Sequence, residues 1–366
     1  MHVVMTEYFP VRPDDAPTGG VEQRMAQLVQ RLHGPVLVLC SHQPGQPRRH
    51  RFGTAQVHRV GPTTRYSNEG NIVKRILFAL ALFWHGVRQP AGTTIDAASF
   101  LSYVPAALCR MFGARVIVTY HEVWLGRWMR IKGPLTGLFG EVWERMALAI
   151  GFNAVIAVSP STQKELAAHG IRSRVITNGV NVPIGVARPA RGVPTIVYLG
   201  RLVPGKRVDV LLQAAAHVGR KVRIIVIGDG GERRRLEAIA RELGVDATFL
   251  GKVDSATTRR ILERARVFCL PSAVEGFGIS ALEGMAAGIP TLLSDIPPLR
   301  DISDNGRTAL LFPVDDHVAL ATALRRVLSS KGLAHRLAVA GKARACSYDW
   351  NTIARSYEDT IRRVAR

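Results

Sequence analysis

Short apolar runs rich in β-branched residues alternate along this chain with longer segments of helical period. The runs are typical of β-strands, and many of the segments between them are typical of amphipathic helices that end at glycine. Strand followed by helix, repeated, predicts parallel sheets covered by helices on both faces. The predicted strands are HVVMTEYFP, VLVLCS, RVIVTY, AVIAVS, RVITN, TIVYLG, RIIVIGDG, TFLGK, VFCLPS and PTLLSD, and the predicted helices include VEQRMAQLVQRL, STQKELAAHG, RRRLEAIARELG, ATTRRILERA and ISALEGMAAG.

The predicted strands are too many for one sheet, and the chain has a natural break. After residues 178–180 the segment NVPIGVARPARGVP is rich in proline, glycine and small residues, which indicates a linker between domains. We therefore predict the α/β class, with two Rossmann-like, doubly wound parallel-sheet domains at residues 1–180 and 193–346. Ligands of such sheets bind at the carboxyl ends of the strands, so we expect a cleft between the domains to hold the site.

Composition indicates a globular protein with an unusual charge. The 366 residues are 47% hydrophobic, which excludes a disordered chain. Lysine and arginine total 49 against 28 acidic residues, a net charge of +21 that is spread over both halves of the chain. Such a charge indicates anionic partners, namely phosphates, nucleic acid or an acidic membrane surface.

Cysteine usage and the apolar segments bear on location. Four scattered cysteines, at 40, 109, 269 and 346, fit no metal-ligand spacing and indicate reduced thiols in a reducing compartment. The first residues lack the zones of a signal peptide. The most apolar window, residues 76–87, is shorter than the roughly 20 residues of a spanning helix, so we expect a buried or interfacial helix. We therefore expect a cytoplasmic location.

Two glycine-rich turns follow predicted strands. Gly19 and Gly20 open the first helix, where paired glycines let backbone N–H groups approach an anionic ligand, although a plain turn explains them as well. The turn IGDGGER places Gly228, Gly230 and Gly231 after another strand. It lacks the full GxGxxG pattern and the carboxylate about twenty residues on, which argues against an NAD enzyme.

Two cations lie in the loop after the first strand of the second domain. In YLGRLVPGKRVDVLL, Arg201 and Lys206 flank a Pro-Gly turn just before a helix. Two cations and a helix N-terminus suit a diphosphate, since arginine binds its oxygens bidentately and lysine adds a point charge. Taken alone, the pair is more simply interpreted as solvated surface cations.

Two carboxylates bracket the turn in EGFGISALE. Glu275 precedes a predicted helix and Glu283 lies two turns inside it, while Gly276, Phe277 and Gly278 expose backbone donors at the helix start. Carboxylates accept hydrogen bonds from sugar hydroxyls, so the segment suits a sugar nucleotide. Dipole complementation and solvation would explain either glutamate alone. They explain poorly why Glu283 is the only charge in ISALEGMAAG.

Together, these motifs resemble the retaining glycosyltransferases of family 4, also called glycosyl transferases group 1, which adopt the two-domain GT-B fold. The resemblance covers the E-x7-E spacing, the PS before it and the EGMAAGIP after it. It also covers GG-V-E near the start, YHE at 120–122, VSPSTQKEL, NGV at 178–180, GR-x4-K and IGDGGE. The motifs follow in the family's order over nearly all of the chain.

The resemblance implies roles for particular residues. Arg201 and Lys206 would bind the donor diphosphate and stabilise the leaving group, Glu275 would orient hydroxyls of the transferred sugar, and Glu283 would bind the ribose. Gly19 and Gly20 would lie over the diphosphate or the acceptor, and His121 near the reacting face of the sugar. The segment 347–366 would be a helix that crosses back onto the first domain. The expected catalytic residues are His121, Arg201, Lys206 and Glu275, and the expected nucleotide-sugar-binding residues are Gly19, Gly20, Gly228, Gly276, Phe277, Gly278, Ile279 and Glu283.

The mechanism expected from this resemblance is transfer of a sugar with retention of anomeric configuration. Negative charge grows on the departing nucleotide, so cations and helix N-termini aimed there lower the barrier. The two glutamates are then not the acid and nucleophile of a glycosidase. We expect no cofactor and no metal site, with a nucleotide-diphosphate sugar, a GDP or UDP sugar, as the donor.

Two basic segments bear on the acceptor. Residues 48–88 contain eight basic residues and only Glu69 as an acid, and they include the apolar helix. In VWLGRWMRIKGPL, Trp124 and Trp128 are interleaved with Arg127 and Arg130. Both segments would suit peripheral association with an anionic membrane at the inner face of the cell, and a lipid-linked or cell-envelope acceptor. A core helix and the scattered arginines of a high-GC genome explain the same features.

Two other functions remain open at this point. A basic nucleic-acid-binding protein could stack bases on Trp124, Trp128 or Tyr120, but the chain has no recognised nucleic-acid module. We therefore expect no nucleic-acid partner. A sugar phosphorylase or epimerase would share the fold, but the combination of GR-x4-K with E-x7-E favours transfer.

Overall fold

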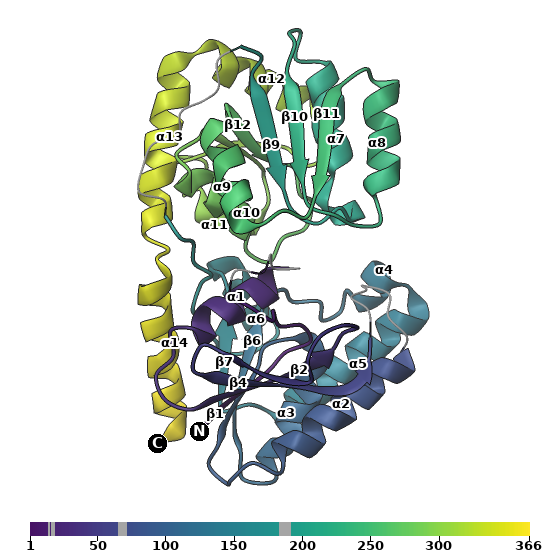
Figure 1. Ribbon diagram of the computed structural model, residues 1–366, viewed down its shortest axis with the longest axis vertical. Coiled ribbons are helices and arrows are strands. Elements are labelled where there is room, and N and C mark those ends of the chain that lie inside the picture. The colour runs from purple at the N-terminus through teal and green to yellow at the C-terminus, as the bar shows by residue number, and fades with distance from the viewer. Residues whose placement is uncertain (14, 16–18, 65–71, 183–191) are drawn as a thin grey trace. The chain divides into compact units, whose positions relative to one another are not determined.

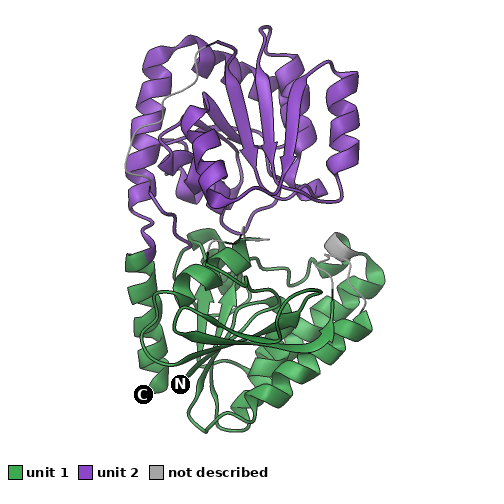
Figure 2. Ribbon diagram, in the orientation of Figure 1, with its two compact units in different colours: residues 1–177, 351–366 green, residues 178–350 purple. Residues whose placement is uncertain are grey.

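The computed structural model describes residues 1–13, 15, 19–64, 72–182 and 192–366. They form two compact units, residues 1–177 with 351–366, and residues 178–350 (Figure 2). These limits differ by a few residues from the predicted limits at 180 and 347. Most of the predicted linker lies outside the described residues. The first unit is called unit 1 and the second unit 2.

Unit 1 is built on an eight-stranded sheet, called sheet 1, with the order β3-β4-β2-β1-β5-β6-β7-β8 (Figure 1). Neighbouring strands are parallel except for the hairpin of β3 with β4. The strands are β1 (His2–Met5), β2 (Val36–His42), β3 (Arg49–Phe52), β4 (Ala55–Thr63), β5 (Thr94–Ala97), β6 (Arg115–Tyr120), β7 (Ala154–Ala157) and β8 (Arg174–Val175).

Three helices lie side by side over one face of sheet 1, with α3 between α2 and α5 (Figure 1). Their inner residues, such as Phe78, Leu82 and Val104, form one core with Val3 and Met5 of β1. The apolar window 76–87 therefore belongs to a helix that buries one face in the core and leaves its outer face exposed. The helices of unit 1 are α1 (Gly20–Val29), α2 (Ile72–Gly86), the 3-10 turn η1 (Phe100–Ser102), α3 (Tyr103–Arg110), α4 (Trp128–Lys132), α5 (Pro134–Ile150), α6 (Pro160–Ala168) and most of α14 (Trp350–Ala365).

Helix α14, from the end of the chain, packs onto unit 1 and buries a polar pair there. The hydroxyl of Tyr357 donates a hydrogen bond to the carboxylate of Asp96 in the middle of β5, and both residues are fully buried. Arg174 of β8 donates to Thr360 over 3.0 Å, and Glu358 lies 3.1 Å from the His33 imidazole. Side chains far apart in sequence thus hold this helix on sheet 1.

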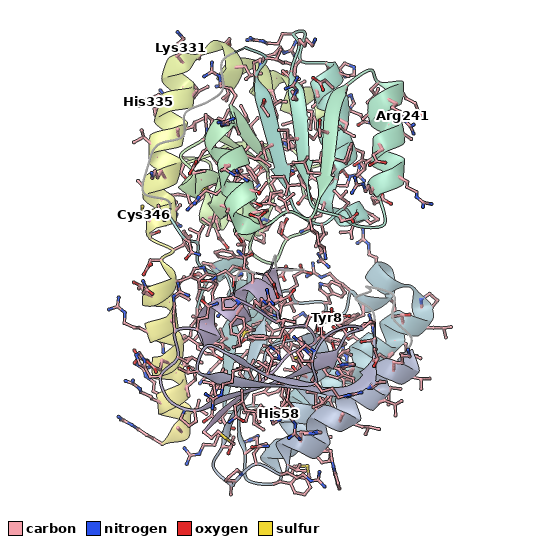
Figure 3. The ribbon with its side chains drawn as sticks, in the orientation of Figure 1. Tyr8, His58, Arg241, Lys331, His335 and Cys346 are labelled. Atoms are coloured by element: carbon pink, nitrogen blue, oxygen red, sulfur yellow. The ribbon has the colours of Figure 1, made fainter. Side chains whose placement is uncertain are left out.

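Unit 2 is built on a six-stranded sheet, called sheet 2, with the order β11-β10-β9-β12-β13-β14, and all neighbouring strands are parallel. The strands are β9 (Thr195–Leu199), β10 (Arg223–Ile227), β11 (Asp246–Gly251), β12 (Val267–Leu270), β13 (Thr291–Ser294) and β14 (Leu310–Phe312). The helices are η2 (Pro204–Lys206), α7 (Val208–Ala216), α8 (Arg233–Glu242), α9 (Ser255–Arg264), α10 (Ile279–Ala286), α11 (Pro297–Ile302), α12 (His317–Ser329) and α13 (Lys331–Cys346). Side chains such as Arg241 on α8 and His335 on α13 are exposed (Figure 3).

The prediction of two Rossmann-like parallel sheets is confirmed, and each predicted strand overlaps an observed one. Four further strands, β3, β4, β5 and β14, were not predicted. Strand β3 (RHRF) is polar because it is an exposed edge, and β5 (TIDA) is short and contains the buried Asp96. Cys40, Cys109 and Cys269 are buried free thiols, whereas Cys346 is exposed on α13 (Figure 3).

We predict that Tyr357→Phe lowers the free energy of unfolding by about 1.5–3 kcal/mol, the usual cost of a hydrogen bond to a charged group. Burial raises the pKa of Asp96 to about 6, and the Tyr357 hydrogen bond opposes this rise. Urea unfolding at pH 7 would measure the loss. Tyr348→Phe is the matched control, because its hydroxyl accepts from Arg344, which is only partly buried, and it should cost less. Equal losses would contradict a special role for the buried pair.

Candidate active site

The carboxyl ends of β9, β10 and β12 lie together at one edge of sheet 2, because these strands are parallel neighbours. Their loops are bonded to one another through the backbone. Leu202 N–H donates to the Asp229 carbonyl over 3.0 Å, and Ala273 N–H donates to the Gly205 carbonyl over 2.9 Å. The three predicted motifs of unit 2 thus meet at one place.

The loops after β9 and β10 approach each other so closely that two positions of the IGDGG turn have no room for a side chain. A Cβ at Gly228, whose φ is +127°, would lie 1.9 Å from the Gly200 carbonyl oxygen. A Cβ at Gly230 would lie 2.2 Å from the Leu202 carbonyl oxygen. Packing of the loops therefore explains both glycines, and the ligand contact expected of Gly228 stays a prediction.

Lys206 and Glu275 are brought together by the folding of two loops. The Lys206 Nζ lies 2.7 Å from Glu275 Oε1, and the two side chains are only 15% and 11% exposed. Nζ also donates to the Val274 carbonyl over 3.2 Å. A half-buried ion pair between the diphosphate-binding and sugar-binding candidates is therefore present at the carboxyl edge of sheet 2.

Tyr198 is a residue of the site that the sequence analysis did not single out. It is hydrogen-bonded to Arg201, and the charges of Arg201 and Glu275 both influence its pKa. The Tyr198 hydroxyl donates to the Arg201 carbonyl over 2.9 Å and so fixes the loop after β9. Burial raises the pKa of Tyr198, the Glu275 charge adds to the rise and the Arg201 charge opposes it. Both charged groups therefore lie within electrostatic range of one hydroxyl. The sequence did contain an indication of this role, because a tyrosine inside an otherwise apolar strand needs a hydrogen-bond partner for its hydroxyl.

The turn before α10 has its side chains in the core and its backbone at the site. Phe277 is 3% and Ile279 8% exposed, and the Phe277 ring contacts Tyr348 with centroids 5.7 Å apart. Gly278 has a φ of +96°, and a Cβ there would lie 2.7 Å from Leu299 Cδ2. Only the backbone donors of this turn are therefore candidates for ligand contact. Gly276 belongs to the same turn, and Glu283 lies partly buried one turn into α10.

His121 follows β6 at the carboxyl edge of sheet 1. Its pKa is lowered to about 3 by burial and by the positive charge of Arg24, against a hydrogen bond to the Ala98 backbone. The imidazole is therefore neutral at physiological pH. Within the described ranges its Nε2 is buried with no hydrogen-bond partner, which leaves it for a ligand hydroxyl.

Arg24 is a second residue that sequence reasoning missed. It lies fully buried on α1, and its Nη1 donates to the Thr177 carbonyl over 2.6 Å. Burial lowers its pKa to about 10, while the charges of Tyr357 and Asp96 oppose the shift. Arg24 and the buried Leu28 are four residues apart, so they lie on the same face of α1. This spacing could have shown from the sequence that an arginine lies on the core face of the helix.

Gly19 and Gly20 begin α1, also at the carboxyl edge of sheet 1. Gly19 is the N-cap with φ −167° and ψ 170°, an extended conformation that any residue adopts. Backbone strain therefore gives no reason for glycine there, and the predicted ligand contact depends on the small size of the residue. Residues 16–18, just before this pair, lie outside the described part of the chain.

The expectation that Trp128 lies on a membrane is wrong. Trp128 is 8% exposed, and its Nε1 donates to the buried carboxylate of Glu144 over 2.6 Å. Trp124 is partly buried and donates to Glu122 over 2.8 Å. Their spacing of four reflects an aromatic cluster, with ring centroids 4.7 Å apart. Arg127 pairs with Glu165 at 3.2 Å, and Arg130 is exposed.

A different set of apolar residues is exposed on unit 1. We call it the apolar outer face, because its members lie on α2 and α5 away from sheet 1. Their exposed fractions range from 40% at Met146 to 86% at Leu135. The set consists of Ile72, Val73, Ile76, Leu77, Leu80 and Trp84 on α2, and of Leu135, Leu138, Val142 and Met146 on α5.

Two further searches covered the described residues. Among them, no group of three or more histidine, cysteine, aspartate or glutamate side chains is placed to hold a metal ion. No helix in the described ranges is both long and apolar enough to cross a membrane.

Two Rossmann-like units, each built on a parallel sheet whose motif-bearing loops lie at its carboxyl edge, are the architecture of the GT-B class of α/β proteins. Sequence profiles refine this class. The profile described as Glycosyltransferase Family 4 matches residues 18–183, and the one described as Glycosyl transferases group 1 matches residues 187–344. The matches account for nearly the whole chain, which belongs to the family-4 glycosyltransferases.

Individual relatives are similar over part of their length. A phosphatidyl-myo-inositol mannosyltransferase of Mycobacterium leprae is 35% identical over 210 residues, which cover 54% of this chain and 56% of that protein. A glycogen synthase of Mycobacterium tuberculosis is 34% identical over 189 residues, which cover 49% of this chain and 46% of that protein. The chain thus spans about half the length of the curated relatives it matches.

Solved structures share the fold over the full length. A sucrose-phosphate synthase of Thermosynechococcus elongatus superposes with a TM-score of 0.86 at 23% identity, over 99% of this chain and 98% of that one. Anabaena HepE in complex with UDP and glucose gives a TM-score of 0.77 at 17% identity, over 98% of each chain. At these identities the likeness establishes the fold alone.

We predict that Glu144→Gln makes stability less dependent on pH. Burial raises the pKa of Glu144 from its ordinary 4.5 to about 7, so the folded chain keeps a proton there that the unfolded chain loses. This contribution to the free energy of unfolding falls as pH rises toward and through 7. Glutamine still accepts the hydrogen bond from Trp128 but does not titrate. Between pH 5 and pH 8 the free energy of unfolding of the variant should therefore rise relative to that of the parent, by at most about 3 kcal/mol.

Urea unfolding at the two pH values would measure this gain. Glu165→Gln, at an exposed ion pair with Arg127, is the control and should show a smaller pH-dependent change. If the difference in the free energy of unfolding between Glu144→Gln and the parent is the same at both pH values, the raised pKa of Glu144 is contradicted.

Proposed function

We propose that this chain is a glycosyltransferase that moves a sugar from a nucleotide-diphosphate sugar to an acceptor. The observation that carries the proposal is the Lys206–Glu275 ion pair, 2.7 Å long, at the carboxyl edge of sheet 2. In this proposal the cation would bind the leaving diphosphate, and the carboxylate beside it would bind the sugar hydroxyls. A ligand that bears both groups would satisfy both charges at once.

The roles of the residues follow from the charge that develops during transfer. When the bond between sugar and phosphate breaks, negative charge grows on the diphosphate, and Lys206 with Arg201 would stabilise it. Glu275 would hold hydroxyls of the sugar, and Glu283 would accept hydrogen bonds from the ribose. Neutral His121, with its buried Nε2, would exchange a hydrogen bond with a sugar hydroxyl without adding charge.

Relatives support this proposal. The mycobacterial relative is named a mannosyltransferase, and HepE of the same fold was crystallised with UDP and glucose. We therefore propose a GDP or UDP sugar as the donor. Retention of configuration and independence from metal ions are proposed on family membership alone.

We further propose a lipid-linked acceptor and peripheral binding to an anionic membrane. The apolar outer face exposes ten large apolar side chains on two helices of one layer. Lys74 of α2 and Arg130 of α4 are exposed as well, and they would contact lipid phosphates. The relative of 35% identity is named for a phosphatidyl-myo-inositol acceptor, which agrees with such a surface.

We expect Lys206→Ala to weaken nucleotide binding by about 10- to 100-fold, because a charge-assisted contact contributes about 1.5–3 kcal/mol. Isothermal titration with GDP, UDP and ADP would identify the base and measure the loss. Glu283→Ala should reduce binding of the same nucleotide. Lys221→Ala is the matched control, because this exposed lysine precedes β10 at the opposite edge of sheet 2. If no nucleotide binds the parent while DNA does, the proposal fails and a nucleic-acid-binding function replaces it.

We expect the double variant Leu80→Gln, Leu138→Gln to bind phosphatidylglycerol vesicles at least tenfold more weakly, since each loses about 1 kcal/mol of apolar burial. Vesicle sedimentation would measure the partition. Val318→Gln with Val339→Gln is the control, as both valines are 55% exposed in unit 2. Equal binding by both double variants would argue against the apolar outer face as the membrane contact.

A further inference from the structure

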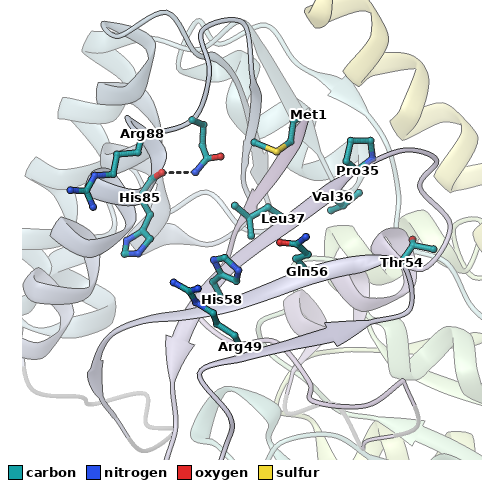
Figure 4. A pocket seen from close by; sticks show the side chains of 11 residues that line it. Met1, Pro35, Val36, Leu37, Arg49, Thr54, Gln56, His58, His85 and Arg88 are labelled. Atoms are coloured by element: carbon teal, nitrogen blue, oxygen red, sulfur yellow. Dashed lines mark hydrogen bonds between the residues drawn. The ribbon is translucent and has the colours of Figure 1, made fainter.

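Unit 1 contains a pocket at the edge of sheet 1 opposite to His121 and to the glycines that begin α1. It has a volume of about 440 Å³ and is lined by residues at the starts of β1, β2 and β4 and at the end of α2 (Figure 4). His121 and the glycines of α1 lie at the carboxyl edge of sheet 1, whereas Met1, Val36 and Gln56 of the pocket lie at its amino edge. The pocket therefore belongs to neither the donor site nor the acceptor candidates. Its lining is Met1, Pro35, Val36, Leu37, Arg49, Thr54, Gln56, His58, His85, Arg88 and Gln89.

The pocket is lined by cations and amides. Arg49 and His58 are opposite each other as a cross-strand pair of the β3–β4 hairpin. His85 lies in the last turn of α2, and Arg88 follows two residues after its end. Of the described residues that line it, none is acidic. Figure 4 shows Arg49 beside His58, with His85 across from them and the Arg88 side chain directed away from them.

The electrostatics of His58 show that the local charge is uncompensated. Burial lowers the pKa of His58, and the positive charges of Arg49 and His85 lower it further. The charged groups that act on His58 are Arg49 on β3 and His85 on α2, and the other polar groups of the lining include Gln56 on its own strand and Arg88, two residues after α2. An anion placed among them would relieve this repulsion and favour the protonated imidazole.

The geometry of the donors suits an oxyanion with several oxygens. His85 Nδ1 donates to the Ala81 carbonyl over 2.9 Å, so its Nε2 would donate to an anion in the protonated ring. The guanidinium of Arg49 offers paired N–H groups, which match phosphate oxygens. The amide of Gln56 and the hydroxyl of Thr54 add neutral donors suited to the hydroxyls of a larger ligand.

One residue links the pocket to the apolar outer face. The guanidinium of Arg88 lies 4.0 Å from the ring centroid of Trp84, which is 55% exposed. Trp84 and Arg88 thus form a pair of aromatic ring and cation, an arrangement typical of the membrane interface. A phosphate bound in the pocket would lie beside this pair.

We propose that this pocket is a second binding site, which takes a phosphate ester through Arg49, His58, His85 and Arg88. The ligand is either a free phosphate ester or the headgroup of an anionic lipid, and the chemistry of recognition is the same. The site does not depend on the glycosyltransferase activity. Its test therefore needs no donor, and its failure would leave the proposed function untouched.

Histidine-selective ¹⁵N NMR of the full chain tests the site with inorganic phosphate and glycerol 1-phosphate at constant ionic strength. We expect the His58 and His85 resonances to shift on titration and the pKa of His58 to rise. Binding should be tighter at pH 6 than at pH 8, because the anion favours the protonated rings. Arg49→Gln should weaken binding about tenfold, through loss of a charge-assisted pair.

Arg220→Gln is the matched control, because it removes the same charge from an exposed residue of unit 2 that does not line the pocket. Sedimentation with phosphatidylglycerol and phosphatidylcholine vesicles separates the two sources. A lipid headgroup is the ligand if Arg49→Gln with His58→Gln binds phosphatidylglycerol several-fold more weakly than Arg220→Gln does. A free phosphate ester is the ligand if only the soluble probes respond. The inference is overturned if neither soluble phosphate nor phosphatidylglycerol distinguishes the pocket variants from the control.

Discussion

The candidate active site of unit 2 depends on the close approach of two backbone segments. The loop after β9 and the loop after β10 pack so tightly that a Cβ at Gly228 or Gly230 would meet a carbonyl oxygen of the other loop at about 2 Å. Because the two loops cannot separate without loss of these contacts, Lys206 is held where Glu275 of the third loop can pair with it. The loop after β12 joins this packing through the hydrogen bond from Ala273 N–H to the Gly205 carbonyl.

Much of this arrangement could be predicted from the sequence, because parallel strands inside a sheet are short, apolar and β-branched. TIVYL and VFCL, for example, are almost wholly buried, so their pattern was visible without tertiary information. Parallel strands also carry their loops to one edge, so Lys206 and Glu275 could be expected near each other. Their direct contact, and the neutral state of His121, depend on side-chain packing that no local pattern contains.

The features that could not be predicted depend on contacts between distant segments. Trp128 has the spacing and the cationic neighbours of a membrane-surface residue, but Glu144, sixteen residues further on, draws its indole into the core. Conversely, α5 has apolar residues on all sides, so the sequence pattern could not distinguish its exposed side from its buried side. The edge strand β3 contains two arginines and a histidine because it is paired on one side only.

Helix α14 makes unit 1 discontinuous, since its residues 351–366 complete a core that begins with β1. Asp96 is buried against Tyr357, so a fragment that ends at residue 177 would expose a carboxylate selected for the interior. The first half of the chain is therefore not a separable module, although it has its own sheet. During synthesis, unit 1 cannot reach its final packing until residues 351–366 have left the ribosome, whereas residues 178–350 of unit 2 are made before them. The unit whose strands are made first is thus expected to complete its folding last.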